Sequence, residues 1–137
     1  MSTRKNNRAS LRRGFSLIEL LMVIAIIGII ATIAVPILLS ARSDSLDEKA
    51  RQSVRVILSA QQAFYAKYSE FGQLDDLAND VPPFLDQRFT SSPADLGNGL
   101  TVSMVLGGDS QSFTVSTSNP GGSHDYSADE SFVITEL

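Results

Sequence analysis

The chain has 137 residues, of which 43% are hydrophobic and 19% charged; this suits one compact domain with a short extra segment and excludes two full domains or a disordered chain. The absence of cysteine and the single histidine exclude disulfide scaffolds, cysteine nucleophiles and metal sites built from thiolates or several histidines. Five of the 11 basic residues and no acid lie in the first 14 positions, whereas 6 basic and 15 acidic residues follow. This acidic main body is a poor surface for phosphates, so no direct nucleic acid binding is expected.

An uncharged apolar run, LLMVIAIIGIIATIAVPILL, occupies residues 20–39. As a helix it would span roughly 30 Å, the thickness of a bilayer core. It has no polar stripe, so we expect it to lie in lipid or inside an assembly. Because basic residues precede it, the N-terminus is expected in the cytoplasm and the body on the other side of the membrane.

Three interpretations of this run compete. A secretory signal peptide would have an apolar region of about 7 to 15 residues ending in a small-residue cleavage site, but this run is longer and is followed by Ser40-Ala41-Arg42. A single-span anchor fits the length. A third interpretation must account for Glu19, which lies among apolar residues just before the run. A carboxylate there is costly unless headgroup water solvates it, and a plain anchor has no use for it.

The stretch Arg12–Leu21, with Gly14 before Phe15 and Glu19 as the fifth residue counted from Phe15, resembles the type IV pilin signal, which the pseudopilins of type II secretion systems also carry. The resemblance continues to Pro36 and covers about 25 residues closely. It implies that a prepilin peptidase cuts between Gly14 and Phe15 and methylates the new amine of Phe15. It also implies that Glu19 pairs with the N-terminal amine of a neighbouring subunit in a filament.

Two residues weaken the helix that this resemblance implies. Pro36 removes a backbone hydrogen bond and is expected to bend the helix, and Gly28 costs about 1 kcal/mol relative to alanine in an exposed helix. Both match places where pilin helices bend or loosen on packing. Glycine and proline are also common in ordinary membrane helices.

Beyond the apolar run the helical pattern becomes amphipathic. An apolar stripe at three- to four-residue spacing, interrupted only by Gln61, extends from Leu46 to Tyr68. Asp47 and Arg51 are expected to pair on the opposite face, and Gly72 to stop the helix. The pattern predicts one helix from Phe15 to about Tyr68, roughly 80 Å long.

The remainder predicts a loop followed by an antiparallel sheet. Residues 73–98 contain Pro82-Pro83, Pro93 and Gly97-Asn98-Gly99, which indicates a loop with short helical pieces. Alternating patterns predict strands at 100–106 and 113–117, joined by a turn at 107–110, and a third strand or closing hairpin at about 125–135 with a turn at 129–131. An antiparallel meander laid across the helix would bury one face of each strand.

Two features depart from the family or invite other functions. Many type IV pilins close the C-terminal region with a disulfide, which this chain cannot form, and major pseudopilins often hold calcium there. Asp125, Asp129 and Glu130 are candidate calcium ligands, but acidic residues are also ordinary in surface turns.

Other chemistry has little support in the sequence. The aromatic residues between Phe64 and Phe71 are explained by core packing. Adjacent His124 and Asp125 do not make a catalytic dyad, and no nucleophile motif is present. We therefore expect no enzymatic activity, no catalytic residue and no cofactor or metal.

The sequence thus predicts an α+β, pilin-like fold in four parts: a leader at 1–14 that is removed, an assembly helix at 15–39, an amphipathic helix at 40–72 and a head at 73–137. The expected protein is a filament subunit of a type IV pilus or a pseudopilus, held in the inner membrane before assembly. Its expected partners are a prepilin peptidase, the lipid bilayer, an inner-membrane assembly platform, and copies of itself or related pilins. The alternative is a single-span anchored protein with an acidic extracytoplasmic binding domain.

Overall fold

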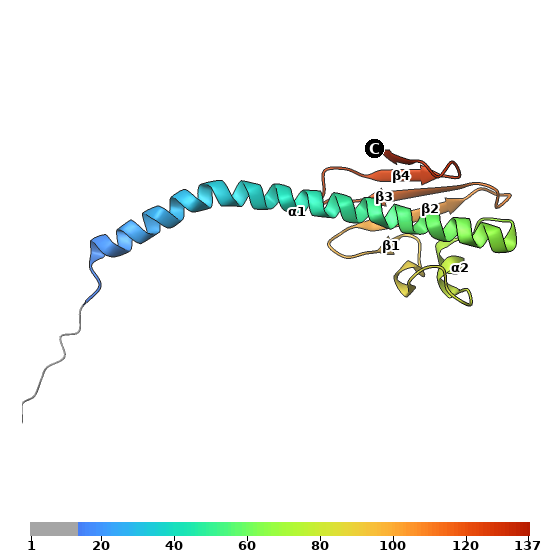
Figure 1. Cartoon of the computed structure of the whole chain (residues 1–137), viewed down its shortest axis with the longest axis horizontal. Helices are drawn as coiled ribbons and strands as arrows, with labels where there is room; N and C mark the ends of the chain where they lie inside the picture. Colours follow the sequence, from blue (N-terminus) through green and yellow to red (C-terminus); the bar gives the residue numbers. More distant parts are fainter. Residues whose placement is uncertain (1–13) are drawn as a thin grey trace, which may run out of the picture. The chain divides into compact units, whose positions relative to one another are not determined.

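A computed structural model describes residues 14–137, which form a long helix, two short helical segments and a five-stranded antiparallel sheet (Figure 1). The elements are α1 (Leu17–Tyr68), α2 (Leu74–Asn79), η1 (Gln87–Phe89), β1 (Ala94–Asp95), β2 (Thr101–Leu106), β3 (Phe113–Ser118), β4 (Tyr126–Asp129) and β5 (Ile134–Glu136). The chain divides into two compact units, one ending at Ile37 and one spanning Leu38–Leu137. The predicted α+β class is confirmed; the predicted leader, apart from Gly14, lies outside the described residues.

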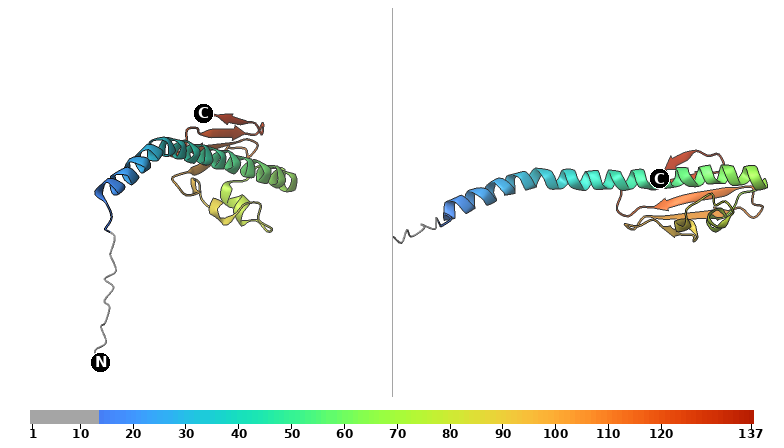
Figure 2. Two further views of the ribbon diagram at one scale, coloured as in Figure 1. Left: turned by 60° about the vertical axis from the view of Figure 1, so that its left-hand side comes forward. Right: turned by 60° about the horizontal axis from the view of Figure 1, so that its bottom comes forward.

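The head, residues 38–137, has two layers. The sheet follows chain order, β1-β2-β3-β4-β5, with every neighbouring pair antiparallel. It packs along one side of the C-terminal part of α1, as the views in Figure 2 show. The two central strands and the closing hairpin therefore agree with the alternation in the sequence.

The two faces of the sheet differ in chemistry. Val102, Met104 and Val115 point into the core and are buried. On the other face, register places a hydroxyl side chain on each of four adjacent strands: Ser103 lies opposite Ser116, Ser116 opposite Ser127, and Ser127 opposite Thr135. The period of two thus gives an apolar face for the helix and a hydroxyl face for solvent.

The buried face of α1 follows the three- to four-residue spacing seen in the sequence. Ala50, Val54 and Ile57 are completely buried against the sheet. Gln61, which interrupts this apolar stripe, is also completely buried. Its side chain donates to the carbonyl oxygen of Gly72 at 2.6 Å and accepts from the Gly72 amide at 3.2 Å. Gln61 therefore supplies both hydrogen bonds that this stretch of backbone needs inside the core.

The predicted end of α1 near Tyr68 is confirmed, but Gly72 is not the residue that stops the helix. The helix ends at Tyr68, and Ser69 takes the left-handed conformation with φ of 61°. Gly72 has a different role: a Cβ there would lie 2.7 Å from Leu77 and 2.8 Å from the Phe64 ring. A glycine is required at this position because the backbone passes too close to the core for a side chain.

The predicted loop at 73–98 contains short helical pieces, as expected, and also strand β1, which the sequence analysis missed. The strand consists of only Ala94 and Asp95, paired with Val102 and Thr101. Two residues are too few to show an alternating pattern.

The aromatic residues near the end of α1 are only partly explained by core packing. Phe64 and Phe71 are buried, and the Phe71 and Phe113 ring centroids lie 4.8 Å apart in an edge arrangement. Tyr65 and Tyr68 instead remain 41% and 44% exposed. The Tyr68 hydroxyl donates to Asp80, which Lys67 also contacts at 2.9 Å. These two tyrosines therefore lie at the edge of the core.

Replacing Gln61 by alanine should lower the free energy of unfolding of the head by about 2–4 kcal/mol, because two buried backbone groups of Gly72 lose their partners. Denaturation of the detergent-solubilised full chain, followed by tyrosine fluorescence, measures this change. The matched control is Gln62→Ala on the exposed face, which should stay within about 0.5 kcal/mol of the unchanged protein. Equal effects of the two substitutions would show that the Gln61 hydrogen bonds contribute nothing.

Candidate functional site

The N-terminal end of α1 presents the predicted cleavage site in accessible backbone. Residues 14–16 precede the helix and are exposed, with Phe15 at 72%. A Cβ built on Gly14 would meet nothing within 4 Å. The bond between Gly14 and Phe15 is thus outside regular structure, as a protease requires of its substrate.

Glu19 lies in the first turn of α1 and is exposed. The amides of Glu19 and Leu20 donate to the carbonyl oxygen of Ser16 at 3.1 and 3.2 Å, so the helix starts from Ser16. A negative charge in this turn is favoured by the helix dipole. Ser16 and Glu19 also have the sequence spacing of a capping box.

The apolar part of α1 is not covered by any residue between 14 and 137. Every residue from Phe15 to Leu39 is exposed, and the most hydrophobic 18-residue window of the helix has no buried residue. Large apolar side chains point in all directions, including Leu17 at 83%, Ile29 at 66% and Leu38 at 70% exposure. An apolar surface of this extent requires lipid or protein around it.

The two predicted weak points lie within this segment. The helix continues through Pro36, whose ring nitrogen has no hydrogen to donate. Gly28 is in open surroundings, since a Cβ there would touch nothing within 4 Å. Packing inside the chain therefore does not require a glycine at 28, and a bend at Pro36 stays a prediction.

A second polar site joins α1 to the loop between β3 and β4. Asp47 is buried, and its Oδ1 accepts hydrogen bonds from the amides of Ser123 and His124 and from the Asn119 side chain at 2.9 to 3.2 Å. The predicted pairing of Asp47 with Arg51 on the exposed face is therefore wrong. The signal was available, because Asp47 is in phase with the buried stripe that continues through Ala50.

His124 lies between two carboxylates that are distant in sequence. Its Nδ1 is 3.3 Å from Asp47 Oδ2, and its Nε2 is 3.1 Å from Glu136 Oε1. The ring thus connects the helix with the last strand, while Asp125 instead accepts from the Asn119 amide at 2.6 Å. The His124 side chain therefore links three segments, namely α1, the loop between β3 and β4, and β5.

The loop approaches Asp47 so closely that it requires a glycine. A Cβ on Gly122 would lie 2.1 Å from Asp47 Oδ1 and 2.0 Å from Asn119 Nδ2. Partial burial raises the pKa of Asp47, but the amides of His124 and Ser123 and the His124 ring outweigh it and lower that pKa below its usual value. The carboxylate form of Asp47 is therefore the form that this loop stabilises.

The three candidate calcium ligands have separate environments. Asp129 accepts from the amide and hydroxyl of Ser131 in the β4–β5 turn, Asp125 holds Asn119, and Glu130 is exposed. Among residues 14–137, no three acidic or histidine side chains are grouped so that they could hold a metal ion.

Comparisons with known proteins agree with the geometry of the N-terminal segment. Residues 10–35 match the family described as the prokaryotic N-terminal methylation motif. The motif, the exposed apolar helix and the small sheet together resemble the architecture of type IV pilins.

One relative is the type IV major pilin protein PilA of Myxococcus xanthus (strain DK1622), which is 39% identical over 69 residues. The match covers 50% of this chain and 30% of the relative, so the chain spans about a third of the length of that pilin.

Replacing Asp47 by asparagine should destabilise the head at pH 7 by about 1.5–3 kcal/mol, because hydrogen bonds to a charged acceptor are lost. A lowered folded-state pKa gives stability that is present above the unfolded pKa, near 3.9, and is lost as pH falls through the folded value. The difference between the unchanged protein and Asp47→Asn should therefore shrink below about pH 4. Denaturation of the detergent-solubilised chain at several pH values measures it, with exposed Asp44→Asn as the control.

Proposed function

We propose that this chain is a non-enzymatic structural subunit of a type IV pilus or pseudopilus. The observation that carries the proposal is an apolar helical segment that no residue of the described chain covers, and that begins at Leu17, shortly after the exposed Gly14–Phe15 bond. Before assembly the apolar segment lies in the inner membrane, with the N-terminus in the cytoplasm. In the filament, neighbouring apolar helices replace the lipid.

Cleavage of the leader creates the positive charge with which Glu19 is expected to pair. A prepilin peptidase hydrolyses the bond between Gly14 and Phe15, which leaves a positive amine on Phe15, and then methylates that amine. In an apolar surrounding, this amine and Glu19 of an adjacent copy each compensate the other's desolvation. A copy that slips along the axis leaves a charge unpaired, so the pair sets the register of subunits. The inner-membrane assembly platform would then move correctly registered subunits out of the bilayer.

The intact mass of the protein purified from cell membranes tests the processing step. We expect a chain that starts at Phe15 and carries one added methyl group. The control, Gly14→Val, should retain the leader, because a side chain then occupies the cleavage position. A chain that keeps residues 1–14 in cells containing the peptidase would favour the single-span anchor, and one starting near Arg42 would indicate secretion.

Replacing Glu19 by glutamine separates the assembly role from helix capping, because glutamine serves in a capping box but carries no charge. Loss of one partner from a buried ion pair costs about 3–5 kcal/mol, so filament yield should fall on the order of a hundredfold or more. Filaments sheared from cells and quantified against membrane-held protein give this ratio.

Glu70→Gln, which removes an exposed charge from the head, is the matched control and should leave filament yield unchanged. Normal filaments from Glu19→Gln would rule out the charge pair as the register device.

A further inference from the structure

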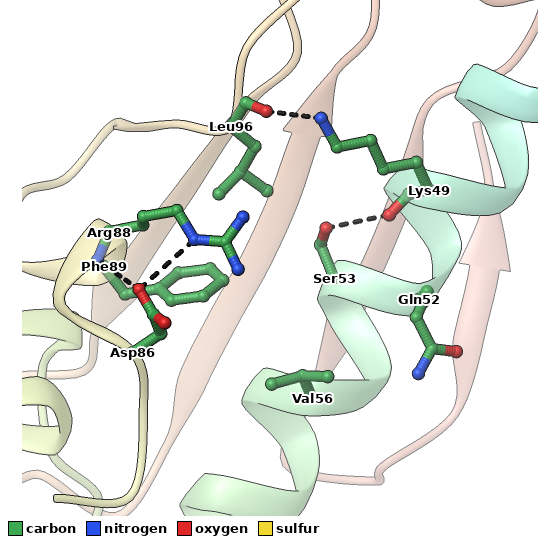
Figure 3. A pocket seen from close by; sticks show the side chains of 8 residues that line it. All are labelled: Lys49, Gln52, Ser53, Val56, Asp86, Arg88, Phe89 and Leu96. Atoms are coloured by element: carbon green, nitrogen blue, oxygen red, sulfur yellow. Dashed lines mark hydrogen bonds and ion pairs between the residues drawn. The ribbon is translucent and has the colours of Figure 1, made fainter.

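A groove follows one side of α1 within the head. It consists of two adjoining hollows of about 270 and 310 Å³, which share Gln52 and Val56. The first lies between α1 and the segment around η1 (Figure 3); the second continues along α1 to Ala63 and Phe84. From Lys49 to Ala63 the helix extends about 21 Å, so the groove is long enough for a short peptide segment.

The groove combines apolar side chains with positive charge. Val56, Phe89 and Leu96 line the first hollow, and the charged side chains along the groove are Lys49, Arg55, Arg88 and Asp86. Half of the 6 basic residues after position 14 are therefore gathered here, on a body that contains 15 acids.

Arg55 and Arg88 both have hydrogen-bond donors that a further partner could use. Arg55 is 3.9 Å from Glu48, and both side chains are about half exposed or more. Arg88 uses Nε for Asp86 at 3.2 Å and is 64% exposed, so the terminal nitrogens of its guanidinium have donors to spare. The groove would accept a segment with an apolar side chain and flanking acids.

The opposite edge of the same head carries such a segment. Strand order places β1, which packs beside η1, at one edge of the sheet and β5 at the other; Figure 1 shows α2 and β4 on opposite flanks of α1. In the connection between β4 and β5, Val133 is 62% exposed. It is flanked by the acids Asp129, Glu130 and Glu136.

We propose that the β4–β5 connection (residues 130–133) of one copy docks into the α1–η1 groove of the next copy. This inference rests on the proposed filament function and names the contact between heads. Four strand spacings, about 19 Å, separate the two edges, so the connection does not reach the groove of its own head. A contact between different surfaces repeats without closing when the rotation between copies does not close a ring, which builds a helical assembly.

Cysteine pairs test this contact, because the chain has no cysteine of its own. In the full-length protein, Val133→Cys is combined with Gln52→Cys or with Ala63→Cys, at two points along the groove. Mild oxidation of sheared filaments should give a ladder of disulfide-linked multimers with at least one pair, since a disulfide needs Cβ atoms about 3.5–4.5 Å apart.

The matched control pairs each groove cysteine with Val105→Cys, an equally exposed valine on the hydroxyl face of the sheet. It should give no ladder, and neither should any single cysteine. Intact filaments without a ladder from either pair would overturn the docking and leave the filament function standing. Failure of the unchanged chain to form filaments in cells with the assembly machinery would instead overturn the filament function.

Charge reversal is an independent test that needs no disulfide. Arg55→Glu and Glu130→Arg should each lower filament yield, by roughly three- to tenfold, because like charges then face each other across the contact. The double variant should recover most of the yield. Arg51→Glu makes the same charge change on the exposed face of α1 away from both hollows and should have little effect. Equal losses from Arg51→Glu and Arg55→Glu, or no recovery in the double variant, would overturn the proposal.

Discussion

One helix has to meet two different burial requirements, and the rest of the molecule follows from this. Up to Leu39 its side chains are apolar on all sides, and nothing in the described part of the chain covers them. From Leu46 onward it has a single buried face, which a five-stranded sheet covers. The change from an all-round apolar surface to a stripe marks where the environment must change from lipid or neighbouring helices to the chain's own sheet. The sheet therefore covers one face of the C-terminal part of α1, and the apolar N-terminal part of the helix needs cover from elsewhere.

The head is attached to the helix by two different kinds of contact. Apolar packing places Ala50, Val54 and Ile57 in one hydrophobic core with the sheet. Polar contacts fix the position at each end: Gln61 holds the backbone of Gly72, and Asp47 holds the loop that carries His124. Hydrophobic burial is not directional, whereas these hydrogen bonds specify which backbone groups meet the helix.

The parts of the structure that periodicity governs could be predicted from the sequence. The long helix, the two central strands and the closing hairpin all follow from spacings of three to four or of two. The polar contacts could not be predicted in this way, because their partners are far apart: His124 lies 77 positions from Asp47. A spacing rule for exposed helices placed Asp47 with Arg51, while its phase with Ala50 and Val54 pointed into the head. The end of α1 near Tyr68 was predicted correctly, but the role of Gly72 was not, since Gly72 is a glycine because of close packing with Phe64 and Leu77.

The hydroxyl face of the sheet has a consequence for how the protein behaves as conditions change. Ser103, Ser116, Ser127 and Thr135 follow one another across four strands, and none of these side chains titrates in water. The carboxylates elsewhere on the head lose their charge in acid, and salt screens them. Hydration of this row depends on neither pH nor ionic strength. This row should therefore keep its water in media where the carboxylates of the head lose their mutual repulsion.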